Sequence, residues 1–209
     1  MTPQLAAFLT FTFILVITPG STTAVVVRNT LAGGRAAGLR SAAGAALGNT
    51  THAIAAWLGL AIVFARWPLA MTGLRLAGAA YLAWLGLNSL FRVVRYPDGG
   101  LRMMSEGANG PATQGRSGSF RQGLTVNLLN PAIATFYLVV VPAFVLAGYS
   151  RWHFAALAAI HITMALVFHG LWAVAFDGLR RLLRPPLARR LVEASAGVAL
   201  IGLAVRILR

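Results

Sequence analysis

Two short interruptions, Thr18-Pro19-Gly20 and Asn127-Leu128-Leu129-Asn130-Pro131, each lie inside an otherwise apolar stretch of the sequence. A proline within a helix lacks a backbone N–H donor and clashes with the preceding turn, so nearby carbonyl groups lose their intrahelical partners. In hydrocarbon such groups are tolerated only where neighbouring helices or a water-filled cavity satisfy them. Two proline-interrupted spans in corresponding positions therefore predict a transport site between the breaks.

The composition is typical of a protein that crosses the membrane several times. Apolar residues make up 58% of the 209 residues, and charged residues only 11%. A bilayer core of roughly 30 Å takes about 20 apolar residues per helix. The sequence predicts an all-α membrane protein, a single polytopic domain over 1–209, with six transmembrane helices. The six apolar blocks are 5–27, 41–65, 68–91, 123–147, 153–176 and 191–208.

The two halves of the chain have related patterns. Phe8 and Pro19 each have a counterpart 112 residues later, at Phe120 and Pro131 (120 minus 8 and 131 minus 19). With three helices per half, the second half enters the membrane from the opposite face, so broken helices 1 and 4 meet near mid-membrane. We therefore expect a 3+3 inverted repeat. Its parts are the first repeat 1–92, a flexible cytoplasmic linker 93–119 and the second repeat 120–209.

The formal net charge of +14 comes from 18 arginines and no lysine. Thirteen of these arginines fall in alternate loops, one of which is a short glycine-rich loop at 28–38. By the positive-inside rule, these loops are predicted to be cytoplasmic and both termini external. Anionic lipid, rather than nucleic acid, is the expected partner of the basic loops. Arg75 and Arg206, outside this set, are expected to extend to the headgroups. The thirteen are Arg28, Arg35, Arg40, Arg92, Arg95, Arg102, Arg116, Arg121, Arg180, Arg181, Arg184, Arg189 and Arg190.

The second apolar block carries a packing face and a polar cluster. Gly44 and Gly48 form a small-xxx-small pattern, which predicts close helix packing. Asn49 and His52 follow inside the span, where polar groups are costly and usually face the bundle interior. His52 is predicted to carry the coupling proton, because histidine changes protonation near neutral pH. The alternative is that His52 only forms a hydrogen bond in packing.

Two further histidines, His161 and His169 in the fifth block, are alternative proton carriers. Eight residues apart, they lie about 80° around a helix from each other, so one of them is expected to face the cavity. No enzyme motif and no paired carboxylate occurs within an apolar block, so we expect no catalysis, no cofactor and no bound metal. A metal-cation exporter and a non-transporting scaffold remain as alternatives. The first lacks a mid-span Asp, Glu or Cys as ligand, and the second would not need two aligned breaks.

The sequence resembles the LysE/RhtB family of bacterial amino-acid exporters over nearly the whole chain. The resemblance implies export of amino acids or related small metabolites across the bacterial cytoplasmic membrane, driven by the proton gradient. It rests on five motifs in the right order. They are Thr18-Pro19-Gly20, the Arg-Asn-Thr-Leu-x-x-Gly-x-x-x-Gly loop at 28–38, the Gly-Ala-Ala-Tyr-Leu-Ala-Trp-Leu-Gly run at 78–86, Phe120-x-x-Gly123, and Asn127-Leu128-Leu129-Asn130-Pro131.

This sequence departs from the family pattern at two positions. Ser21 stands where relatives usually have proline, and Ala132 stands where they usually have lysine. The second change removes a positive charge beside the second break. The family's acidic, Asn or His position in helix two matches either Asn49 or His52, and the sequence leaves that choice open.

An exported amino acid needs an anion site, acceptors for its ammonium group and a proton relay. Backbone amides freed at the breaks are predicted to bind the carboxylate, and Thr18, Asn127 and Asn130 to accept hydrogen bonds from the ammonium. The hydroxyls at 21–23 either satisfy carbonyls freed by Pro19 or also contact substrate. Because no carboxylate lies mid-span, a neutral amino acid such as threonine, homoserine or a branched-chain type is favoured. The residues predicted to bind substrate are Thr18, Pro19, Gly20, Ser21, Asn127, Asn130 and Pro131. The residues predicted to couple protons are His52, Asn49 and His161. The sequence leaves open whether the protein forms a homo-oligomer.

Overall fold

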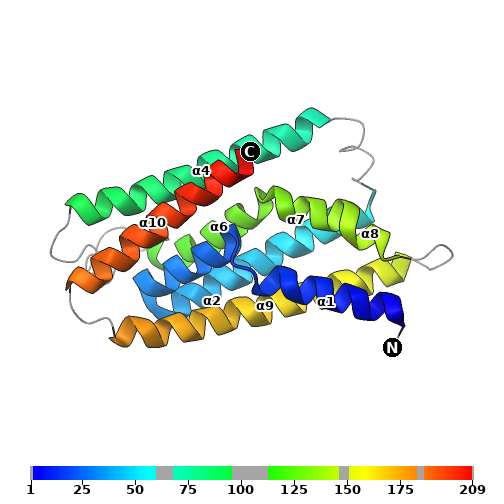
Figure 1. Cartoon of the computed structure of the whole chain (residues 1–209), viewed down its shortest axis with the longest axis horizontal. Coiled ribbons are helices and arrows are strands. Elements are labelled where there is room, and N and C mark those ends of the chain that lie inside the picture. Colours follow the sequence, from blue (N-terminus) through cyan, green and yellow to red (C-terminus); the bar gives the residue numbers. More distant parts are fainter. Residues whose placement is uncertain (1, 60–67, 96–112, 146–150, 183–185, 209) are drawn as a thin grey trace.

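Helices are the only regular structure in the part of the chain that the structure describes. A computed structural model describes residues 2–59, 68–95, 113–145, 151–182 and 186–208. The helices run nearly parallel to one long axis and form a bundle (Figure 1). In chain order they are α1 (Pro3–Ile17), α2 (Ser21–Trp57), α4 (Pro68–Arg95), α6 (Thr113–Leu128), α7 (Pro131–Thr135), the π-helix η2 (Phe136–Val140), α8 (Val141–Ala143), α9 (Arg151–Leu182) and α10 (Pro186–Leu208).

The first predicted break is present. α1 ends at Ile17, and α2 begins at Ser21. Thr18 closes α1, because both its backbone N and its Oγ1 donate to the Ile14 carbonyl, at 3.1 and 2.7 Å. Gly20 then takes an extended conformation and caps α2 without a side-chain hydrogen bond.

The loop predicted at 28–38 is mostly helical, which corrects the sequence interpretation. α2 continues through it and reverses direction at Gly34, whose φ of 76° and ψ of −177° are readily adopted only by glycine. Gly38 then packs directly against Thr30, so α2 consists of two adjacent limbs, 21–33 and 35–57 (Figure 1). Only Gly34 leaves the helical conformation at this reversal. A longer loop was expected because the segment is polar and rich in glycine.

Arg28 was predicted to lie in a lipid-facing loop, and this was wrong. Its side chain is 7% exposed. Nε donates to Ser89 Oγ of α4 at 2.8 Å, and Nη1 donates to Gln122 Oε1 of α6 at 3.2 Å. A buried guanidinium is tolerated when its donors find such partners. Arg28 therefore joins three helices instead of facing the membrane surface.

Asp177 is a buried carboxylate that lies one residue beyond the predicted fifth block. α9 continues through it to Leu182. Its Oδ1 accepts from the backbone N of Arg35 at 3.1 Å, directly after the reversal at Gly34. An acidic side chain at the start of the second limb of α2 satisfies a free amide and complements the helix dipole.

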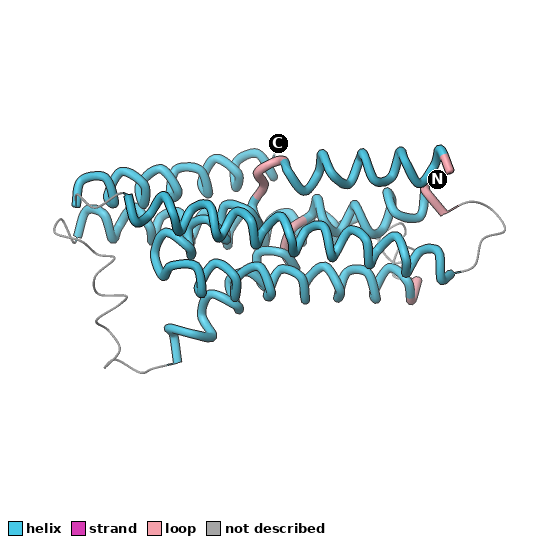
Figure 2. The backbone as a smooth tube through the Cα atoms, turned by 90° about the horizontal axis from the view of Figure 1, so that it is seen from below, coloured by secondary structure: helices cyan, strands magenta, loops and turns pink. Residues whose placement is uncertain are grey.

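The second predicted break separates α6 from α7. The helices 118–128 and 131–143 are bent by 55° across it. Asn130 caps α7, because its Oδ1 accepts from the Ala132 backbone N at 3.0 Å, and Pro131 occupies the first helical position, where a missing N–H costs nothing. Figure 2 shows short loop segments within the bundle, away from its ends.

The second limb of α2 packs closely on α6. A Cβ added to Gly123 would overlap the Ser41 carbonyl, and one added to Gly44 would overlap the Phe120 carbonyl. The small-residue face predicted in the second block is therefore confirmed, and its partner is α6. Glycine is required here because the two backbones themselves are in contact.

The linker predicted at 93–119 is helical at both ends, since α4 runs to Arg95 and α6 begins at Thr113. The stretch between them, 96–112, lies outside the described residues. Two helical stretches, Thr72–Arg95 and Trp152–Leu179, are each long and apolar enough to cross a membrane, and the two bent pairs pass the same test together. By length and composition, the described residues hold up to four spans. Six spans in an inverted repeat stay a prediction.

Candidate functional site

Both breaks border one cavity of about 620 Å³. They lie near the middle of the long axis of the bundle (Figure 1). The volume of this cavity is within the range of small-molecule binding sites. All seven predicted substrate-site residues line it: Thr18, Pro19, Gly20, Ser21, Asn127, Asn130 and Pro131.

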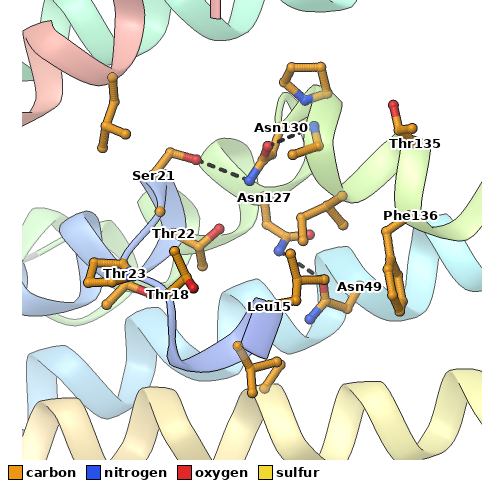
Figure 3. A pocket seen from close by; sticks show the side chains of 18 of the residues that line it. Leu15, Thr18, Ser21, Thr22, Thr23, Asn49, Asn127, Asn130, Thr135 and Phe136 are labelled. Atoms are coloured by element: carbon orange, nitrogen blue, oxygen red, sulfur yellow. Dashed lines mark hydrogen bonds between the residues drawn. The ribbon is translucent and has the colours of Figure 1, made fainter. Parts of the chain in front are cut away.

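The two breaks are joined across the cavity by a hydrogen bond. Asn130 Nδ2 donates to Ser21 Oγ at 3.0 Å (Figure 3). Ser21 begins α2, whose first-turn amides have no intrahelical carbonyl to bind. Gly20 offers no side chain to cap them. The amino end of α2, with its partial positive charge, therefore borders the cavity.

Two residues of the cavity wall carry buried polar atoms without hydrogen-bond partners. Asn127 Nδ2 donates to Asn49 Oδ1 at 2.9 Å (Figure 3). Among the described residues, Asn127 Oδ1 and Thr22 Oγ1 are buried and have no hydrogen-bond partner. Both residues line the cavity and are at most 5% exposed. Leaving a buried acceptor unsatisfied costs about 1–3 kcal/mol, so both residues carry unused hydrogen-bonding capacity beside the cavity, with Asn127 Oδ1 lying against Gly48 of α2.

His161 and His169 of α9 both line the cavity. The expectation that one of them would face it was therefore wrong, because the cavity extends along more than two turns of α9. The Tyr137 hydroxyl lies 2.6 Å from His161 Nδ1, and the Phe136 ring lies 4.3 Å from the imidazole by ring centroids. His161 is thus a buried, oriented imidazole in the cavity wall.

His52 lies behind the wall and is not among the cavity-lining residues that the structure describes. Its Nε2 is 3.2 Å from the Asn127 backbone carbonyl, and its ring is stacked 6.4 Å from that of Tyr137. Asn127 is in the last turn of α6, where carbonyls lack intrahelical partners. This contact matches the packing role considered for His52, and its coupling role stays a prediction.

Two arginines that were expected to extend to the headgroups line the cavity. They are Arg75 of α4 and Arg206 of α10, and both are exposed. A charge well inside an apolar block marks a functional position by default, and Arg75 carried this signal. Among the described residues, no Asp or Glu lines the cavity and no three His, Cys, Asp or Glu side chains form a metal-ion site.

A family model, LysE type translocator, matches residues 13–209. The chain belongs to the LysE type translocator family. It is therefore a member of a transporter family, and its apolar helices are those of a multi-pass membrane protein. The motifs by which it resembles this family include both breaks and the segment that holds the reversal at Gly34.

Three curated relatives show the range of similarity. An uncharacterized membrane protein of Bacillus subtilis, YrhP, is 27% identical over 204 residues, 97% of each chain. A leucine efflux protein of Klebsiella pneumoniae is 31% identical over 124 residues, 59% of this chain and 55% of the relative. A homoserine/homoserine lactone efflux protein of Salmonella typhimurium is 31% identical over 140 residues, 67% of this chain and 64% of the relative. The last two matches thus span less than two thirds of those proteins, and no solved structure matches the chain.

Proposed function

We propose that the chain is a secondary exporter of neutral amino acids that works by proton antiport across the bacterial cytoplasmic membrane. The observation that carries the proposal is the shared cavity at the two helix breaks, whose lining residues include Thr22 and Asn127, each with a buried oxygen that has no hydrogen-bond partner among the described residues. Relatives named for leucine efflux and for homoserine efflux support the amino-acid class.

The cavity offers complementary groups for the two ends of a zwitterion. Turned toward the cavity, the Thr22 and Asn127 side chains accept hydrogen bonds from the ammonium group. The carboxylate binds toward the amino end of α2, where first-turn amides and the dipole favour an anion. Apolar side chains of the wall, among them Leu15, Phe136 and Leu203, face the substrate side chain. This arrangement favours leucine-like or small neutral substrates over lysine.

Proton coupling is assigned to His161. Of the two histidines that line the cavity, His161 has its ring oriented by the Tyr137 hydroxyl, and histidine changes protonation near neutral pH. Asn49 lines the same cavity beside Asn127. Proton antiport requires the cavity to open alternately to the two sides of the membrane. In a six-span inverted repeat, rocking of residues 1–92 against residues 120–209 about the two breaks supplies that motion.

The proposal is tested by an export assay in cells fed dipeptides that release leucine, threonine, homoserine or lysine. Expression of the chain should lower the intracellular level of a neutral amino acid and raise its external level, while lysine stays unchanged. Cells that carry an empty vector are the control. Equal levels of every amino acid with and without the chain would contradict the proposal and favour a scaffold.

A further inference from the structure

Arg75 and Arg206 reach the cavity from two neighbouring helices. Both line the cavity, and both side chains are exposed. α10 ends near the middle of the long axis of the bundle, beside α4 (Figures 1 and 2). Arg206 belongs to the last turn of α10. The arginines therefore border the same cavity as the helix breaks, far from the ends of the bundle.

Each arginine lies next to one of the two breaks. Gly78, one turn after Arg75, is so close to Leu129 that a Cβ would overlap the Leu129 carbonyl at the second break. Ala204, two residues before Arg206, packs with Val25 of α2 in one hydrophobic cluster. This contact places the end of α10 against the first turns of α2, after the first break.

The chemistry of the pair suits a carboxylate. A guanidinium is planar and always charged, and its fork of donors matches the two oxygens of a carboxylate. Within the described residues, the rest of the cavity wall holds no Asp or Glu that would neutralise the two positive charges. Charged side chains at membrane depth are costly and are kept where they contact a substrate pathway.

We infer that Arg75 and Arg206 form the carboxylate-recognition pair of the cavity, so that the site requires a substrate with a free carboxylate and no second positive charge. The inference rests on the proposed export function and adds the residues that select the substrate. In this arrangement the ammonium binds at Thr22 and Asn127, while the carboxylate lies between the arginines and the amino end of α2.

The same cationic pair would also suit the phosphate of a lipid headgroup, so the experiment separates the two sources of anion. Binding of leucine and threonine, and of their amides leucinamide and threoninamide, is measured by calorimetry on the purified full chain. The measurement is made in nanodiscs of phosphatidylcholine and in nanodiscs containing phosphatidylglycerol. The variants are Arg75→Gln and Arg206→Gln. The matched control is Arg95→Gln on α4, whose guanidinium stacks over Phe91 at 5.7 Å and does not line the cavity.

The wild-type protein should bind the amino acid about tenfold more tightly than its amide, which lacks the carboxylate. Arg75→Gln and Arg206→Gln should each weaken amino-acid binding about tenfold and leave amide binding unchanged. Both effects should be the same in the two kinds of nanodisc. The control Arg95→Gln should bind like the wild type. Arg206→Lys should recover part of the lost affinity, since it keeps the charge without the fork.

Three outcomes would overturn the inference while leaving the proposed function intact. They are unchanged amino-acid binding in both variants, an equal loss for amino acid and amide, and a loss confined to phosphatidylglycerol nanodiscs, which would assign the pair to lipid. A wild-type chain that exports no amino acid in the dipeptide assay would overturn the proposed function, and the inference with it.

Discussion

At the scale of single residues, two of the three buried polar atoms that have no partner among the described residues belong to residues that line the cavity. Thr22 Oγ1 and Thr12 Oγ1 are both buried hydroxyls with no partner among the described residues. Only Thr22 belongs to the cavity wall that the structure describes. The chain thus contains a matched pair of similar groups, one at the candidate site and one outside it.

Thr22→Val should raise the KM for the exported amino acid about tenfold, because valine keeps the shape and removes an acceptor for the ammonium. The same change should leave thermal stability equal or slightly higher, since an unpartnered buried hydroxyl is destabilising. Transport kinetics in proteoliposomes and thermal unfolding of the purified protein measure the two effects. Thr12→Val is the control and should change neither KM nor expression; an equal KM effect in both variants would contradict a substrate role for Thr22.

His161→Gln should abolish uphill export driven by an imposed pH gradient while keeping substrate exchange at equilibrium. The reason is that glutamine retains a polar group but does not change its protonation near neutral pH. Tyr137→Phe, which removes the hydroxyl beside His161, should reduce gradient-driven export less than His161→Gln. If His52 carries the coupling proton instead, His52→Gln would lose gradient-driven export and His161→Gln would keep it.

At the scale of helices, glycine contacts hold the broken spans together. Gly123 brings α6 against the second limb of α2, where its Cα faces the Ser41 backbone. On the same helix, Gly118 has open space around the position of a Cβ. Gly123→Ala should therefore destabilise the protein by about 1–3 kcal/mol through overpacking, whereas Gly118→Ala should have little effect. Thermal unfolding in detergent compares the two, and equal midpoints would show that the contact can relax.

Pro131→Ala concerns the helix break itself. Alanine restores a backbone N–H and allows α6 and α7 to join into one hydrogen-bonded helix across the cavity. We expect export to fall more than tenfold while the amount of membrane-inserted protein stays within twofold of the wild type. Export in cells and quantitative immunoblotting of membranes give the two values. Normal export by the inserted variant would show that Asn130, which caps α7, keeps the break open without the proline.

At the scale of the whole molecule, the arginine distribution predicts that 93–119 is cytoplasmic and that both termini are outside. Alkaline phosphatase fused after Gly110 should be inactive, and the same reporter fused to the C-terminus should be active. A second reporter that is active only in the cytoplasm should show the opposite pattern. Phosphatase activity at Gly110 would contradict the orientation, and inactivity at the C-terminus would contradict six spans.

Local chemistry made several features predictable from the sequence. Proline cannot continue a helix from within, so both breaks could be located from residues alone, and glycine at helical spacing identified the packing face of the second block. The apolar blocks identified a membrane protein, and the order of five motifs identified the family that the comparison confirmed. These properties depend on neighbours in the chain, so no knowledge of the tertiary arrangement was needed.

The tertiary structure alone decided which side chains meet. Arg28 resembled a loop cation until α4 and α6 supplied Ser89 and Gln122 as partners, and Arg75 resembled a headgroup anchor until the cavity placed it in its wall. His161 and His52 could not be ranked, because the direction a histidine faces depends on how its helix is rotated against the others. Sequence determined where the helices break and what they are made of, and packing determined which charges and hydroxyls surround the space between them.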